Sequence, residues 1–120
     1  IIVNRDHLLS EAKNTIIDMS EGYNPPEPET FKLPGAAGRM AIEIAAKGMV
    51  KSGKISEHDA LIGKKLAYVL TGGDKAGPFT SLDEQYLLDI ERECFLSLCG
   101  EQKSIDRIEF MLKKGKPLRN

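Results

Sequence analysis

The stretch Ser81–Pro117 constrains the fold of this chain most strongly, because it carries start and stop signals for two helices. Ser81 stands three residues before Glu84, the spacing of a capping box, and Gly100 can end the helix in the left-handed conformation. Apolar residues recur between these signals at helical spacing: Leu87, Ile90, Cys94 and Leu98. We expect them to form the inner face of the first helix.

A second helix is predicted to begin at Ser104. Lys113 and Lys114 fall in its last turn, where positive charge suits the helix dipole, and Gly115 and Pro117 follow as a stop. The residues expected on its inner side are Ile105, Ile108, Met111 and Leu112. The stretch is therefore predicted to be a helical hairpin.

Three more helices are predicted before the hairpin. The first runs over about 6–20, the second begins after Gly35 and breaks at Ser52, and the third is capped at Ser56 and stops at Thr71. The apolar stripe of the first helix is Leu9, Ala12, Ile16 and Met19. No stretch shows sustained strand alternation. About five helices with short connections predict an all-α fold, a single helical module over 1–120.

A proline-rich connector separates the first helix from the rest. Pro25, Pro26 and Pro28 exclude a helix there and favour an extended segment. We expect a stiff strap that lies across a helical body, anchored by Tyr23 and Phe31.

The second helix carries a narrow face of small residues that permits close approach of a neighbouring helix. This face is Ala37, Met40, Ala41, Ile44, Ala45 and Gly48. One hypothesis for the chain is therefore a non-catalytic protein–protein interaction module that docks a partner helix on this face.

Composition narrows the class of protein. At 120 residues the chain is one domain by size. Its formal charge of −1, from 17 basic and 18 acidic residues, disfavours nucleic-acid binding. No apolar run reaches the roughly 20 residues of a membrane span. Cys94 and Cys99 point about 140° apart on one helix, which favours reduced thiols and a cytoplasmic setting.

Candidate chemistry is sparse. His58 and Asp59 beside Glu57 suggest a metal site or a catalytic base, but acidic residues are favoured in a first helical turn by the dipole alone. The segment Gly35–Arg39 offers helix amides and a guanidinium to a phosphate, although a plain turn explains it as well. We therefore expect no catalytic residues, no metal site and no cofactor bound by this chain itself.

The end of the second hairpin helix is more suggestive. Phe110 lies three and four residues before Lys113 and Lys114, so a flat ring and positive charge share one helix end. Such an end can hold a nucleotide-like group by stacking and ion pairing. The alternative is a core phenylalanine beside lysines that match the dipole.

The run SIDRIEFMLKKGKP over 104–117 resembles the C-terminal signature of the crotonase (enoyl-CoA hydratase) superfamily, roughly S-x-D-x-x-E-G-x-x-A-F-x-x-K-R-x-P. Phe110 matches its Phe, Lys113 its Lys and Pro117 its closing Pro, whereas the chain departs from it at Arg107-Ile108-Glu109. The segments SGKISEHD, LAYVLTGGD and LKKGKPLRN are similar to the C-terminal region of bifunctional 3-hydroxyacyl-CoA dehydrogenase/enoyl-CoA hydratases.

This resemblance implies a fragment of a longer fatty-acid β-oxidation enzyme, an expectation that fits a start at Ile1-Ile2-Val3. Crotonase and NAD-binding domains would lie upstream, and the helices would mediate domain or subunit packing in a homo-oligomer. The fragment would cap the acyl-CoA site without being catalytic alone. Carried over residue by residue, the resemblance nominates Phe110 and Lys113 as CoA contacts, with Phe95 as a further candidate.

Overall fold

The computed structural model describes residues 5–120. Within these residues five α-helices carry the fold, which confirms the all-α prediction, and there is one small antiparallel pair of strands. The elements in chain order are a 3-10 turn Arg5–His7, α1 Leu8–Ser20, β1 Thr30–Phe31, α2 Gly35–Lys51, α3 Glu57–Leu70, β2 Leu82–Asp83, α4 Glu84–Cys99 and α5 Gln102–Lys114.

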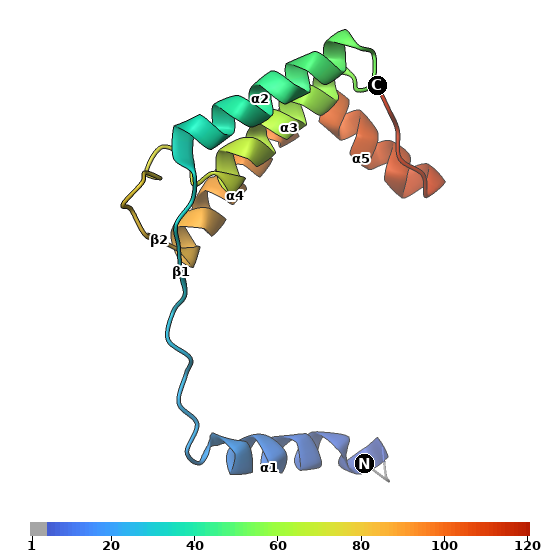
Figure 1. Ribbon diagram of the computed structural model, residues 1–120. Helices are drawn as coiled ribbons and strands as arrows, with labels where there is room; N and C mark the ends of the chain where they lie inside the picture. Colours follow the sequence, from blue (N-terminus) through green and yellow to red (C-terminus); the bar gives the residue numbers. More distant parts are fainter. Residues whose placement is uncertain (1–4) are drawn as a thin grey trace.

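The helices fall into a body and an outlying element (Figure 1). In the body α3 packs between α2 and α4, and α5 follows α4 at the far end. The strand pair lies at the other end, where Thr30 faces Asp83 and Phe31 faces Leu82. From β1 an extended connector leads away to α1, which lies apart from the body.

The hydrophobic core is small and sits where α3 meets α4 and the strand pair. Its buried hydrophobic side chains among residues 5–120 are Ala67, Leu82, Ile90 and Cys94. Leu87 and Leu98 are half-buried on the same side of α4. The predicted inner face of this helix is therefore confirmed.

The start of α4 differs from the prediction. Its N-cap is Asp83, whose carboxylate accepts a 2.7 Å hydrogen bond from the Tyr86 amide, so the predicted cap at Ser81 is wrong. Pairing with β1 holds Leu82 and Asp83 extended, and the helix therefore begins only at Glu84. The helix does end at Gly100, but in the right-handed conformation with φ −79°, not the left-handed one.

Helix α5 presents to the body the side opposite to the one that the sequence predicted. It begins at Gln102 instead of Ser104, and Ser104 is buried in its first turn. The residues expected inside are exposed, from 37% for Ile105 to 81% for Leu112. Polar contacts from Ser104 and Arg107 fix the side that faces α3, which leaves the apolar side outward. The stop at Gly115 is confirmed, since this residue is left-handed with φ 64°.

No other helix covers the small-residue face of α2 within the described residues 5–120. The side of α2 next to α3 carries half-buried Gly38, Arg39 and Ala46 instead. The whole predicted face is exposed: Ala37, Met40, Ala41, Ile44, Ala45 and Gly48.

The connector extends away from the body and does not lie across it. Residues 23–29 are neither helix nor strand. Tyr23 is 67% exposed and does not anchor the connector to the body, whereas Phe31 is half-buried in β1, so the two-anchor prediction is wrong for Tyr23. The prolines keep the segment extended, and the body holds it through β1.

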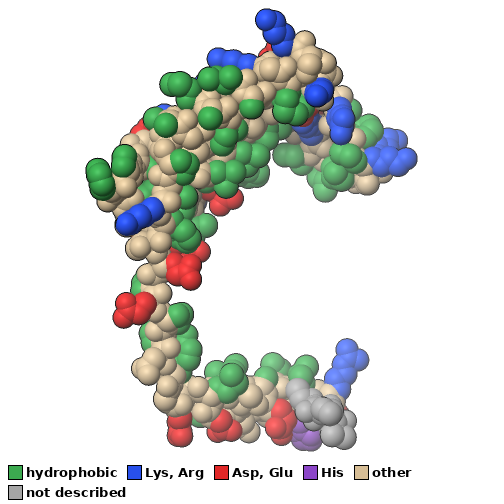
Figure 2. Space-filling view, viewed as in Figure 1, with side chains coloured by type: hydrophobic (Ala, Val, Ile, Leu, Met, Phe, Trp, Pro, Cys, Tyr) green, Lys and Arg blue, Asp and Glu red, His purple; other side chains and the backbone are tan. Residues whose placement is uncertain are grey.

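The described chain is far more open than a compact protein of its length. Its accessible surface is 9691 Å², against about 6,400 Å² for a folded monomer of this mass. Its radius of gyration is 21.4 Å, against about 14 Å. In the space-filling view the molecule is an open C, with hydrophobic side chains on its inner side (Figure 2). The fold therefore leaves a large apolar area in contact with solvent.

Candidate functional site

The three predicted CoA contacts lie on the two helices of the hairpin. Phe110 is half-buried on α5 and Phe95 is 60% exposed on α4. Lys113 is exposed, and its ammonium lies 2.8 Å from the Glu109 carboxylate one turn earlier. That hydrogen bond raises the pKa of Lys113.

Phe95 lines a groove of about 540 Å³ between α3 and α4. The walls are mostly apolar, with Lys65, Glu91 and Arg92 as the charged members. The other lining residues are Leu66, Val69, Leu70, Leu88, Cys94 and Leu98. None of the lining residues belongs to α5, so the structure does not bring Phe95 into one cavity with Phe110 and Lys113.

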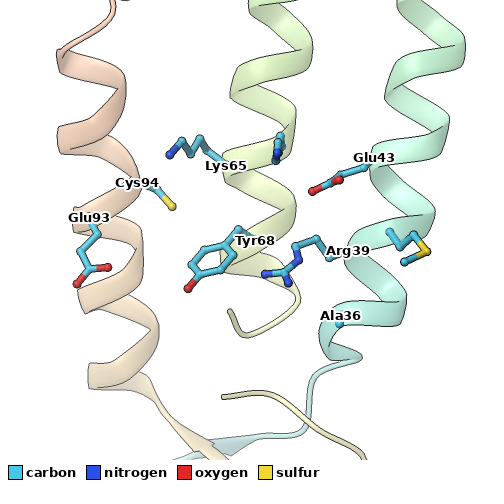
Figure 3. A pocket seen from close by; sticks show the side chains of 9 residues that line it. Ala36, Arg39, Glu43, Lys65, Tyr68, Glu93 and Cys94 are labelled. Carbon is cyan, nitrogen blue, oxygen red and sulfur yellow. The ribbon is translucent and has the colours of Figure 1, made fainter. Parts of the chain in front are cut away.

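A second, more polar cleft of about 670 Å³ lies between α2, α3 and α4 (Figure 3). Both charge signs occur in its walls, which are Ala36, Arg39, Met40, Glu43, Lys64, Lys65, Tyr68, Glu93 and Cys94. In the close view Arg39 of α2 reaches toward Tyr68 of α3. Sequence reasoning did not find this cleft, because its walls come from three separate helices.

Arg39 is held by partners within the chain. Its guanidinium lies 3.0 Å from the Asp74 carboxylate and 5.1 Å from the centroid of the Tyr68 ring. The Tyr68 hydroxyl also donates to Asp74 at 3.1 Å. Hydrogen bonds from Arg39 and Tyr68 lower the pKa of Asp74, and burial together with Asp74 raises the pKa of Tyr68. The cluster ties α2 to the turn after α3.

The Gly35–Arg39 segment forms the beginning of α2. The Gly35 amide donates to the Thr71 carbonyl at 2.9 Å, and a Cβ at this left-handed glycine would meet the Ala76 carbonyl oxygen at 2.7 Å. The Gly35 amide and the Arg39 guanidinium, two of the groups considered for a phosphate, therefore already have partners within the chain. The interpretation of this segment as a structural cap or turn is therefore supported at Gly35 and Arg39.

The His58–Asp59 pair joins α3 to α5. His58 is 4% exposed, with its Nε2 atom 3.1 Å from the Ser104 hydroxyl. Asp59 closes the capping box with Ser56 and lies 2.7 Å from the Arg107 guanidinium. We call this group, with Asn120, the α3–α5 clasp. Among residues 5–120 no group of three or more His, Cys, Asp or Glu side chains could hold a metal ion.

Arg107 is the centre of the clasp. Its Nε atom donates to the Asn120 side-chain oxygen at 2.7 Å, and one Nη donates to the Ser56 hydroxyl at 3.4 Å. The Asn120 side chain donates in turn to the Lys103 carbonyl at 3.2 Å. Arg107, one of the residues at which the chain departs from the crotonase signature, therefore fixes α5 to the body.

The clasp is expected to weaken in acid. The Ser56 amide and the Arg107 guanidinium lower the pKa of Asp59 from 3.8 to about 2. Because the folded pKa lies below the ordinary value, Asp59 stabilises the fold fully above pH 3.8, and this contribution is lost as pH falls toward 2. Urea midpoints of the protein and of Asp59→Asn should converge between about pH 5 and pH 2; a constant difference would contradict this assignment.

Both cysteines are free thiols, as predicted, and burial raises the pKa of Cys94. No helix among residues 5–120 has the length and apolar character needed to cross a membrane.

Comparison with known proteins gives one strong similarity. All of this chain aligns with part of a probable 3-hydroxyacyl-CoA dehydrogenase of Bacillus subtilis (strain 168), at 54% identity over 122 positions. The chain is homologous to a segment of that protein. It spans 15% of the relative's length. No protein-family profile matches the chain, and no solved structure gives a significant match.

The similarity confirms the dehydrogenase side of the resemblance noted in the sequence. The similarity does not test the enoyl-CoA hydratase part of the resemblance, nor the three residues nominated as CoA contacts. The geometry adds that Phe110 and Lys113 share α5 with its outward apolar face, while Phe95 opens into the α3–α4 groove.

Proposed function

We propose that this chain is a helical segment of a 3-hydroxyacyl-CoA dehydrogenase that packs on other parts of the enzyme and caps its acyl-CoA site. The observation that carries the proposal is the exposed apolar surface of a chain that aligns, along its whole length, with a small part of a much longer dehydrogenase. As a unit, residues 1–120 form one module of a multidomain protein, and the module is not catalytic alone.

Packing on a partner explains why so few apolar side chains are buried. Monomeric proteins rarely expose apolar patches above a few hundred Å², and larger ones mark interfaces. The total accessible surface of the chain exceeds that of a compact monomer of this mass by about 3,300 Å². This excess is larger than the area that one partner contributes to an ordinary protein interface.

Capping of acyl-CoA is supported by the end of α5. Phe110 offers a half-buried aromatic ring, and the exposed ammonium groups of Lys114 and of Lys113, which is paired with Glu109, lie within one turn of it in the sequence. Lys116 and Arg119 continue the positive charge after the helix. A base can stack on the ring while its phosphates pair with the lysines. Phe95 would then contribute apolar contact through the α3–α4 groove.

The resemblance extends the proposal to the whole enzyme. NAD would be bound by a separate dinucleotide-binding domain, and an upstream crotonase domain would hydrate 2-enoyl-CoA before the dehydrogenase oxidises the 3-hydroxyacyl-CoA. The enzyme would work in the cytoplasm as a homo-oligomer. In this arrangement the present segment supplies contacts to acyl-CoA but no reacting group.

A second candidate is a pure interaction module without a CoA contact. The observation that favours it is the exposed small-residue face of α2 between Ala37 and Gly48. Both candidates predict association through apolar surface, so association alone does not separate them. CoA affinity does.

We expect Phe110→Ala and Lys113→Ala, each made in the full-length enzyme, to weaken CoA binding by about 1–3 kcal/mol because a stacked ring or a phosphate contact is lost. Isothermal titration with CoA measures this directly. A matched control is Lys47→Ala, an exposed lysine of α2 remote in sequence from the hairpin. Unchanged CoA affinity in both α5 variants would leave the interaction module as the better account.

A further inference from the structure

The inner side of the open C carries apolar surface from α1 and from the body (Figure 2). On α1 the exposed apolar side chains are Leu8, Leu9, Ile16, Ile17 and Met19. The body contributes hydrophobic side chains along its side that faces the hollow. Acidic side chains of α1 lie on the opposite side, away from the hollow. Surfaces that are distant in the chain thus face the same space.

Helix α1 needs a partner to be stable. It has 13 residues, and an isolated helix of this length is marginal in water. It has no side-chain N-cap, and its apolar residues are 47% to 85% exposed. Because the body lies too far away to cover it, the partner must come from outside residues 5–120.

The connector sets the width of the hollow. Nine residues, 21–29, separate the end of α1 from β1, and Pro25, Pro26 and Pro28 stiffen them. Extended at about 3.1 Å per residue, they span about 28 Å. A small folded domain is about 30 Å across. Pairing of β1 with β2 fixes one end of this span to the body.

We propose that α1 and the inner side of the body clamp one folded domain of the same polypeptide between them, with the connector as a spacer of matching length. This rests on the proposed function in one respect, namely that the chain is a segment of a longer enzyme. A domain of the same polypeptide is the favoured occupant because the dehydrogenase relative extends far beyond the 15% that aligns, and because a tethered domain is present at high effective concentration. A second copy fits less well, since the chain is a flat C only 23 Å thick.

Hydrogen exchange of the full-length enzyme tests the clamp. In the wild-type enzyme α1 amides should be protected at least about 10-fold over the same peptide free in solution. Deletion of Pro25–Glu27 shortens the spacer by about 9 Å and should abolish this protection. Replacement of the same three residues by alanines keeps the length and should change α1 exchange less than about 3-fold.

A second pair of variants keeps the test valid if the deletion prevents folding. Ile16→Asp places a charge on the apolar side of α1 and should release α1, whereas Asn14→Asp on the opposite side should not. Free-peptide exchange of α1 in the wild type, or protection unaffected by both the deletion and Ile16→Asp, would overturn the clamp. Protection that rises with enzyme concentration would also overturn it, because the occupant would then be a second copy.

The clamp and the capping role can fail separately. Hydrogen exchange of residues 8–20 measures the protection of α1. The CoA affinity of the Phe110→Ala enzyme measures capping. An intact clamp with unchanged CoA affinity would reject capping alone, and the reverse result would reject the clamp alone.

Discussion

Gly72→Ala is expected to destabilise the body by about 2–5 kcal/mol, a large share of the stability of a domain this small. Gly72 has φ +84°, which an alanine adopts only with strain. A Cβ there would lie 2.6 Å from both the Ala76 Cβ and the Leu82 Cδ1 atoms. Strain and overlap therefore add at the turn that links α3, β2 and α4. Urea unfolding followed by circular dichroism measures the loss.

Two other glycines provide matched controls. Gly53 also has a positive φ of 70°, but a Cβ added there would meet no other atom within 4 Å, so Gly53→Ala should show backbone strain alone. Gly63 lies inside α3 with open space around it, and Gly63→Ala should stabilise the helix by about 0.5–1 kcal/mol. Equal losses at Gly72 and Gly53 would show that the overlap with Leu82 does not matter.

Arg107→Ala is expected to release α5 from the body and to cost about 2–3 kcal/mol. The substitution removes the ion pair with Asp59 and leaves that carboxylate, with its side chain 29% exposed, without its charged partner. It also removes the two hydrogen bonds from Arg107 to Asn120. Exchange of α5 amides should rise, while that of α2 should stay near the original rate.

The control for this change is Arg119→Ala, an exposed arginine beyond the helix. A double-mutant cycle with Asp59→Asn isolates the pair from the rest of the clasp. If the two single changes were additive, Arg107 would stabilise α5 through Asn120 and Ser56 and not through its ion pair with Asp59.

Local signals predicted the elements of this fold well. The cap at Ser56 and the stop at Gly115 follow from a few neighbouring residues, and the structure confirms both. Ser81 misled because a distant strand pairs with Leu82 and Asp83 and keeps them extended. A pattern among residues adjacent in the sequence cannot predict pairing with a strand that lies far away in the chain.

Which side of a helix faces inward could not be predicted where the partner is polar or absent. Apolar periodicity assigned Ile105 and Ile108 to the inside of α5, yet the clasp through Arg107 turns them outward. The same holds for Met40 and Ile44 on α2, which were expected to receive a neighbouring helix and are exposed. Periodicity identifies a face that prefers burial, but not whether this chain or a neighbour buries it.

The candidate site was predictable only in part. Phe110 and Lys113 were nominated from a motif that lies within one helix end. The cleft around Arg39 and Tyr68 depends on Asp74, which is 35 positions from Arg39, and on three helices that pack side by side. The spacing of residues along the sequence does not predict a contact of this kind.

The pairing of β1 with β2 has a consequence for the order of assembly during synthesis. Thr30 leaves the ribosome long before its partner Asp83, so the fixed end of the connector cannot form until the chain has reached the start of α4. Closing the loop between Thr30 and Asp83 carries an entropic cost that is offset only when the later contacts of α4 form. Helix α1 is therefore made early but receives its final position late, after the body that holds the connector has been completed.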